Sequence, residues 1–76
     1  MEAKILELLA SICGTDEVSK RRDLDLFESG LLDSLGVIEL IVGIEDQLGI
    51  KIEPTELERK DIATPDKILD FLRKRQ

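Results

Sequence analysis

Apolar side chains near the beginning of the chain recur at the spacing of an amphipathic helix. The residues at i, i+3, i+4 and i+7 are Ile5, Leu8, Leu9 and Ile12. This pattern predicts a helix over residues 2–13, which Gly14 would end because glycine readily adopts the left-handed conformation of a C′ residue. Residues 15–32 carry only scattered apolar positions. We expect a long loop there, and an ordered loop of that length in so small a domain is usually functional.

A broader apolar stripe predicts a second helix that begins at Asp33 or Ser34 and continues to about Leu48. Both Asp33 and Ser34 are good N-cap residues, because their side-chain oxygens can accept hydrogen bonds from the first backbone N–H groups of a helix. Gly49, followed by Ile50, has the form of a Schellman stop. The apolar positions of the stripe are Leu35, Ile38, Ile41, Val42, Ile44 and Leu48.

Two further helices are predicted in the last third of the chain. Thr55 and Glu58 have the spacing of a capping box, which indicates a short helix. Thr64, with Pro65 at the first helical position, begins the last helix. The sequence therefore predicts an all-α fold in a single domain over residues 1–76, a small bundle of three main helices plus one short helix.

The composition excludes most classes of active site. The 76 residues include 17 acidic and 11 basic side chains, a net charge of -6, and no histidine. Without histidine there is no Ser-His triad, no usual general base and few options for a zinc site. The net negative charge argues against a nucleic-acid partner and favours a basic protein surface. Cys13 is the single cysteine and is expected to be a small core or boundary residue.

The spacing of the residues also excludes two common kinds of binding site, a glycine-rich phosphate loop and an EF-hand. The five glycines form neither a GxGxxG motif nor a P-loop. Asp23-Leu24-Asp25 resembles the start of an EF-hand loop, but position six is Glu28 and position twelve is Ser34. The N-terminus lacks the pattern of a secretory signal, and the longest apolar stretch is too short to span a membrane. We expect a cytoplasmic monomer without membrane insertion, which is not an enzyme and holds no metal.

Acidic side chains are concentrated in the middle of the chain. Residues 23–61 hold 11 acidic and 3 basic side chains, whereas residues 1–22 are neutral overall and residues 62–76 carry a net charge of +2. Glu39 and Asp46 lie seven residues apart and would share a face of the second helix, outside the apolar stripe. This face is either a solvated surface or a docking surface for a basic partner.

One motif carries a resemblance to a known family. Residues 27–40 read Phe-Glu-Ser-Gly-Leu-Leu-Asp-Ser-Leu-Gly-Val-Ile-Glu-Leu, which resembles the signature of the acyl carrier protein family. The resemblance implies that Ser34 accepts 4′-phosphopantetheine from coenzyme A. A phosphate on Ser34 would face the free N–H groups and the positive dipole end of the helix that begins there. The chemistry would then belong to the cofactor and to partner enzymes.

The resemblance also implies partners and further site residues. A phosphopantetheinyl transferase would modify Ser34, after which a loading ligase and a downstream transferase with basic surfaces would use the thiol of the arm to carry cargo as a thioester. Asp33 would help to position the attachment site. The partner-docking residues would be Leu35, Val37, Ile38, Glu39, Asp46 and Glu56.

The sequence leaves the cargo open. Residues 33–40, 55–59 and 64–68 are similar to the D-alanyl carrier proteins of teichoic-acid alanylation, although Ile62 stands where those usually have an aromatic residue and Lys60 replaces an acid. Other specialised acyl carriers fit equally well. A fatty-acid biosynthesis carrier fits less well, because many of these have an acid where this chain has Gly36.

Two readings without a phosphopantetheine arm remain. An unmodified acidic helical protein-interaction module predicts that Ser34→Ala leaves function intact, whereas charge reversal on the acidic face abolishes it. A metal-binding protein would need a stoichiometric, stabilising response to calcium or magnesium.

Overall fold

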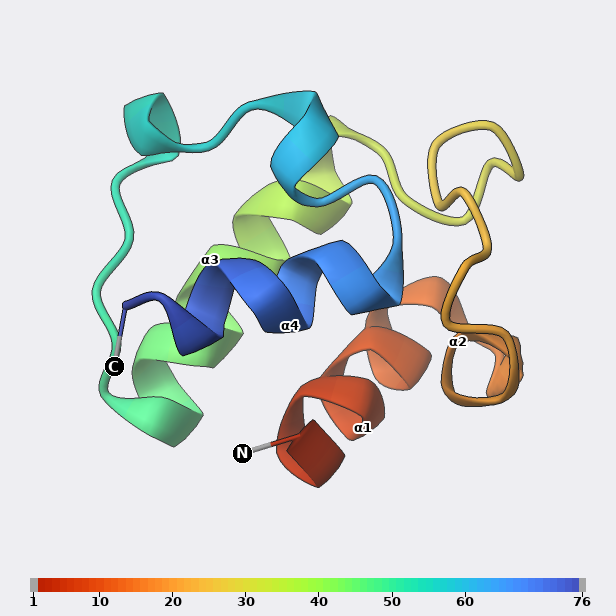
Figure 1. Cartoon of the computed structure of the whole chain (residues 1–76), viewed down its shortest axis with the longest axis horizontal. Coiled ribbons are helices and arrows are strands. Elements are labelled where there is room, and N and C mark those ends of the chain that lie inside the picture. The colour runs from red at the N-terminus through yellow and green to blue at the C-terminus, as the bar shows by residue number, and fades with distance from the viewer. Residues whose placement is uncertain (1, 76) are drawn as a thin grey trace.

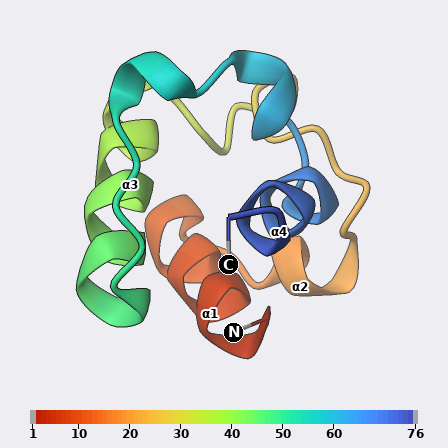
Figure 2. The same ribbon diagram turned by 60° about the vertical axis from the view of Figure 1, so that its left-hand side comes forward.

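The computed structural model describes residues 2–75, which form helices and connections with no strand among them. In chain order the elements are α1 (Glu2–Cys13), α2 (Glu17–Lys20), α3 (Ser34–Leu48), the 3₁₀ turns η1 (Pro54–Glu56) and η2 (Arg59–Asp61), and α4 (Pro65–Arg73). Figure 1 shows the three long helices, and Figure 2 shows α1 between α3 and α4, with the connection from α3 to α4 passing over the bundle. The predicted all-α bundle of three main helices is confirmed.

One aliphatic core joins the three long helices. Ile5 and Leu9 of α1 and Leu72 of α4 are at most 1% exposed, and they meet the inner face of α3 in the same cluster. No polar or charged side chain is buried among residues 2–75. The bundle is therefore held by apolar burial, and no buried polar group has to be compensated. The remaining members of the buried cluster are Val18, Leu26, Leu32, Leu40, Ile41, Ile44, Ile52, Ile62, Ile68 and Leu69.

Helices α1 and α3 approach closely where α3 has a glycine. A Cβ atom added at Gly43 would lie 2.7 Å from Leu8 Cδ1 and 3.2 Å from Leu8 Cγ. Real Cβ atoms do not come so close, so Leu8 occupies the space that a side chain at position 43 would need. This contact places α3 against the first helix.

The connection between α1 and α3 is more ordered than a simple loop. It contains α2, a single helical turn that the hydrophobic pattern did not indicate. Asp25 Oδ1 accepts hydrogen bonds from the backbone N–H groups of Phe27 (3.0 Å) and Glu28 (2.9 Å). The N–H of Leu26, which is fully buried, donates to the Ala63 carbonyl at 2.7 Å. The connection is thereby fixed against the segment that precedes α4.

The predicted short helix capped by Thr55 is wrong in its boundaries. Two separate 3₁₀ turns replace it, because Leu57 between them has an extended backbone (φ −95°, ψ 131°) that ends the first turn. The first turn begins at Pro54, whose fixed φ suits the first helical position. An acidic side chain at the end of each turn accepts from the backbone N–H that precedes the turn: Glu56 from Glu53 (3.4 Å) and Asp61 from Glu58 (3.0 Å).

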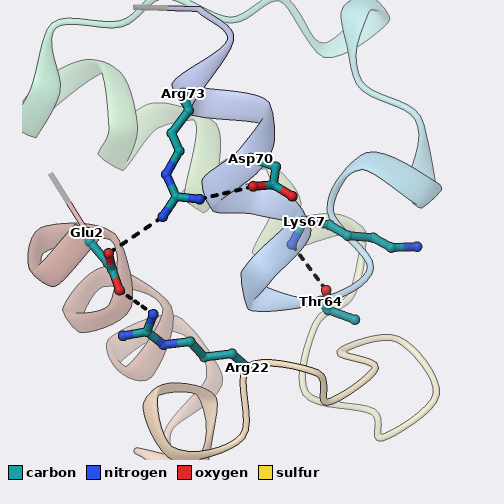
Figure 3. Close-up of polar contacts among 6 residues, drawn as sticks. All are labelled: Glu2, Arg22, Thr64, Lys67, Asp70 and Arg73. Carbon is teal, nitrogen blue, oxygen red and sulfur yellow. Dashed lines mark hydrogen bonds and ion pairs between the residues drawn. The ribbon is translucent and has the colours of Figure 1, made fainter.

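Polar contacts on the surface join the ends of the helices (Figure 3). The Glu2 carboxylate at the start of α1 pairs with Arg22 and, at 3.6 Å, with Arg73 of α4. Thr64 Oγ1 accepts from the Lys67 N–H at 3.2 Å, which confirms Thr64 as the predicted N-cap of α4. These ion pairs are about half exposed, so each contributes little to stability.

No helix within residues 2–75 is long and apolar enough to cross a bilayer. Within the same residues, no three histidine, cysteine, aspartate or glutamate side chains are grouped in a way that could hold a metal ion.

Candidate functional site

The beginning of α3 separates a capping residue from a free hydroxyl. Asp33 has an extended backbone (φ −125°, ψ −173°), and its Oδ1 accepts a hydrogen bond of 2.8 Å from the Gly36 N–H. Asp33 is therefore the N-cap, and Ser34 is the first residue of the helix. The Ser34 side chain is exposed and makes no hydrogen bond with any other residue that the structure describes. Of the two candidate caps, the structure selects Asp33.

The same helix end favours an anion. In the first turn the N–H of Gly36 is satisfied by Asp33, and the first N–H bonded to a backbone carbonyl is that of Val37. The N–H groups of Ser34 and Leu35 at the start of α3 have no partner within the helix. They add to the positive end of the dipole of a 15-residue helix, which favours a phosphate group bonded to Ser34.

An open pocket of about 470 Å³ lies beside Ser34. It is formed where the connection before α3, the beginning of α3 and the η1–η2 segment meet. The guanidinium of Arg59 lies over the Phe27 ring, 4.5 Å from its centroid, on this pocket. A group attached to Ser34 would thus have a partly apolar hollow next to it. The lining residues are Phe27, Asp33, Ser34, Val37, Pro54, Leu57, Glu58, Arg59 and Ile62.

The apolar stripe predicted for the second helix is divided between two faces of α3. Ile41 and Ile44 are buried in the core. Leu35, Ile38 and Val42 point outward, with exposed fractions of 66%, 46% and 60%. Their spacing of three and four residues places them on one side of the helix, so α3 presents an apolar surface to its surroundings.

The acidic residues of α3 lie on that same outer face. Leu35, Glu39, Val42 and Asp46 follow one another at intervals of four, three and four residues, and all four are exposed. We expected Glu39 and Asp46 to lie outside the apolar stripe. This is wrong for the exposed residues of the stripe, since both acids share a face of α3 with Leu35 and Val42. Since α3 contains no basic residue, this face combines apolar contact with uncompensated negative charge.

Two of the predicted docking residues lie elsewhere. Val37 is half-buried and lines the pocket beside Ser34 instead of the outer face. Glu56 is in η1, and its carboxylate pairs with Arg75 at 2.7 Å. The structure thus places Leu35, Ile38, Glu39 and Asp46 together, and it separates Val37 and Glu56 from them.

Sequence reasoning missed Val42 on the outer face of α3 and six residues of the pocket, which are Phe27, Pro54, Leu57, Glu58, Arg59 and Ile62. Val42 could have been found, because a stripe as wide as the one predicted exceeds what one core-facing side of a helix can bury. Phe27 and Arg59 gave no such signal. They become part of the site only because folding brings the connection before α3 to the segment before α4.

The single thiol of the chain belongs to Cys13. Cys13 is partly buried near the end of α1 and does not line the pocket. Desolvation raises the pKa of the Cys13 thiol above its ordinary value, so the thiol is protonated at neutral pH. This agrees with the expected boundary position and makes Cys13 a poor nucleophile.

Comparison with known proteins identifies the family. Residues 3–72 match the phosphopantetheine attachment site family, and the chain belongs to that family. The protein is accordingly a carrier protein that bears covalently attached 4′-phosphopantetheine.

Curated relatives are similar over most of their length. The chain is 43% identical to the D-alanyl carrier protein of Lacticaseibacillus rhamnosus, covering 86% of this chain and 80% of the relative. It is 44% identical to that of Enterococcus faecalis, covering 91% and 88%. For the D-alanyl carrier protein of Abiotrophia defectiva the identity is 37%, over 99% of this chain and 95% of the relative. The resemblance noted in the sequence is thereby confirmed.

Proposed function

We propose that Ser34 is the residue that carries the 4′-phosphopantetheine arm. The observation that supports this most directly is that Asp33 caps α3, which leaves the Ser34 hydroxyl exposed and unbonded at the positive end of the helix. The hydroxyl oxygen would form a phosphodiester with the phosphate of phosphopantetheine, and the nucleotide part of coenzyme A would leave. The arm supplies a terminal thiol that holds cargo as a thioester.

The proposed cargo is D-alanine. The similarity to D-alanyl carrier proteins from several bacteria supports this choice over other specialised acyl carriers. Position 36 supports it independently against a fatty-acid carrier with an acid there. A Cβ at Gly36 would lie 2.8 Å from Leu32 Cδ1, so any side chain at this position would require the buried Leu32 to shift.

The proposed partners bind the outer face of α3. A phosphopantetheinyl transferase, a D-alanine-loading ligase and a downstream D-alanyl acceptor transferase would each place an apolar patch with a basic rim against it. Leu35 and Ile38 supply apolar contact next to Ser34, while Glu39 and Asp46 attract the basic groups. Val37 would contact the arm within the pocket, and Glu56 would take part only after exchanging its pairing with Arg75.

The chain itself performs no catalysis in this proposal. It contains no histidine, and its one thiol is poorly nucleophilic, so bond making belongs to the partner enzymes and to the arm. We further propose that the protein acts as a monomer in the cytoplasm, where coenzyme A is available for its modification.

A loading assay tests the cargo. The holo-protein is incubated with ATP and a D-alanine ligase, and separately with ATP, a fatty acid and an acyl carrier synthetase, and intact masses are compared. We expect a D-alanyl adduct that hydroxylamine removes, as for a thioester, with much less adduct from L-alanine. Efficient fatty-acyl loading without any D-alanyl adduct would contradict the proposed cargo and favour a fatty-acid carrier.

A further inference from the structure

The pocket beside Ser34 contains a cationic group that the proposed function does not use. Arg59, the first residue of η2, is the only basic residue among those that line this pocket, together with the acids Asp33 and Glu58. In Figure 1 the η2 turn (light blue) lies above the beginning of α3 (yellow-green), in agreement with the lining of one pocket by both. Arg59 therefore faces the space into which a group on Ser34 would extend.

The hydrogen-bond donors of Arg59 are available to a ligand. Within residues 2–75, no carboxylate lies within ion-pair distance of its guanidinium. The adjacent Lys60 differs, since it pairs with Glu58 at 3.1 Å. Arg59 Cζ lies over the Phe27 ring, 4.5 Å from its centroid, and this contact with the ring face does not use the N–H donors in a hydrogen bond to a carboxylate.

A phosphodiester on Ser34 would be close enough to this pocket to pair with such a group. It would bring a permanent negative charge next to the Asp33 carboxylate, in a pocket that Glu58 also lines. Like charges at short range repel one another, and both carboxylates lie on the pocket that the phosphodiester would enter. The planar fork of an arginine matches two oxygens of a phosphate group, which makes Arg59 the side chain suited to offset this charge.

We infer that Arg59 is the positioning residue of the arm. Its guanidinium pairs with the two non-bridging oxygens of the phosphodiester on Ser34, and it remains stacked on Phe27. The first part of the arm is thereby held over the pocket and away from the acidic outer face of α3, which stays free for partner enzymes. This inference rests on the proposed attachment of the arm to Ser34.

Phosphorus NMR of the holo-protein tests the pairing. The wild type is compared with Arg59→Gln and with Lys60→Gln, a control that removes one positive charge from the neighbouring residue outside the pocket. We expect Arg59→Gln to shift the ³¹P resonance of the phosphodiester towards that of free phosphopantetheine, and Lys60→Gln to leave it unchanged. In the wild type, the Arg59 Nε–H resonance should shift and its exchange with solvent should slow on conversion from apo to holo.

The outcomes separate this inference from the proposed function. Peptide mapping of each holo-protein first establishes where the arm is attached, and an arm on any residue other than Ser34 would contradict the proposed function. With the arm on Ser34, equal ³¹P shifts in wild type and Arg59→Gln, together with an unchanged Arg59 Nε–H, would overturn the role of Arg59 alone. The Nε–H measurement uses only wild-type protein, so it decides the matter even where Arg59→Gln unfolds.

Discussion

Asp33 Oδ1 accepts a hydrogen bond of 2.8 Å from the Gly36 N–H, and this bond assigns the capping of α3 to Asp33. Its neighbour Ser34 is left with an exposed hydroxyl at the same helix end. Two adjacent residues thus divide two tasks that a serine at the cap would have to combine. Asp33 stabilises the helix, and a group bonded to Ser34 would leave this cap in place.

Because Asp33 and not Ser34 caps α3, alanine substitutions at the two positions should lower the free energy of unfolding by different amounts. Asp33→Ala should lower the free energy of unfolding by about 1 kcal/mol, because it removes the side-chain cap of α3. Ser34→Ala should change it by less than about 0.5 kcal/mol, since the Ser34 side chain makes no contact that the fold requires. Urea unfolding of the apo-proteins measures both. A loss at Ser34→Ala equal to that at Asp33→Ala would show that the serine is the cap.

The exposed apolar residues of α3 should contribute to the binding of partner enzymes and not to the stability of the fold. Val42→Gln should leave the free energy of unfolding within about 0.5 kcal/mol of wild type, because Val42 is 60% exposed. It should lower kcat/KM for the ligase that loads the holo-protein several-fold. Ile44→Ala on the inner face is the matched contrast, and it should cost about 2–5 kcal/mol of stability. An unchanged kcat/KM with Val42→Gln would show that this face of α3 is not part of the docking surface.

The acidic residues of the outer face should act through charge. Glu39→Lys and Asp46→Lys should each slow loading by the ligase several-fold at low salt and less at high salt, because screening weakens attraction between exposed charges. Glu17→Lys on α2 makes the same change in net charge at an exposed position away from α3, so it serves as the control. Equal effects of all three substitutions would show that only the overall charge counts.

The raised pKa of Cys13 predicts which thiol of the holo-protein reacts. A raised pKa lowers the thiolate fraction at neutral pH, and the thiolate is the nucleophile, so Cys13 should react more slowly with iodoacetamide than the solvent-exposed thiol of the arm. Peptide mapping after brief alkylation measures the two rates. Cys13→Ala should retain full thioester loading. Labelling of Cys13 at the rate of the arm would contradict its burial.

The long helices could be predicted from the sequence because their apolar residues repeat at helical spacing and because glycine and cap residues mark their ends. Thr64 and Gly49 illustrate this: the structure has the first as the N-cap of α4 and the second in the left-handed conformation after α3. The α2 turn and the two 3₁₀ turns escaped prediction. Segments of three or four residues are too short to show a hydrophobic period along the sequence.

The candidate site was predictable only where its residues are consecutive. Asp33 and Ser34 belong to one motif, so their neighbourhood could be inferred. The outward direction of Leu35, Ile38 and Val42 could not be predicted. The sequence pattern of an apolar residue is the same whether the bundle buries its side chain or leaves it exposed. The pocket could not be predicted for another reason, since its lining joins residues 27–37 to residues 54–62, which are not neighbours in the sequence.

The intact mass of the protein after incubation with coenzyme A and a phosphopantetheinyl transferase tests the central claim most directly. We expect wild type to gain roughly 340 Da, the mass of one phosphopantetheine group, and Ser34→Ala to gain nothing while keeping its fold. Ser29→Ala, in which the other serine of the motif is replaced, should gain the same mass as wild type. A gain that persists in Ser34→Ala, or no gain in wild type with a transferase that modifies another carrier, would contradict attachment at Ser34.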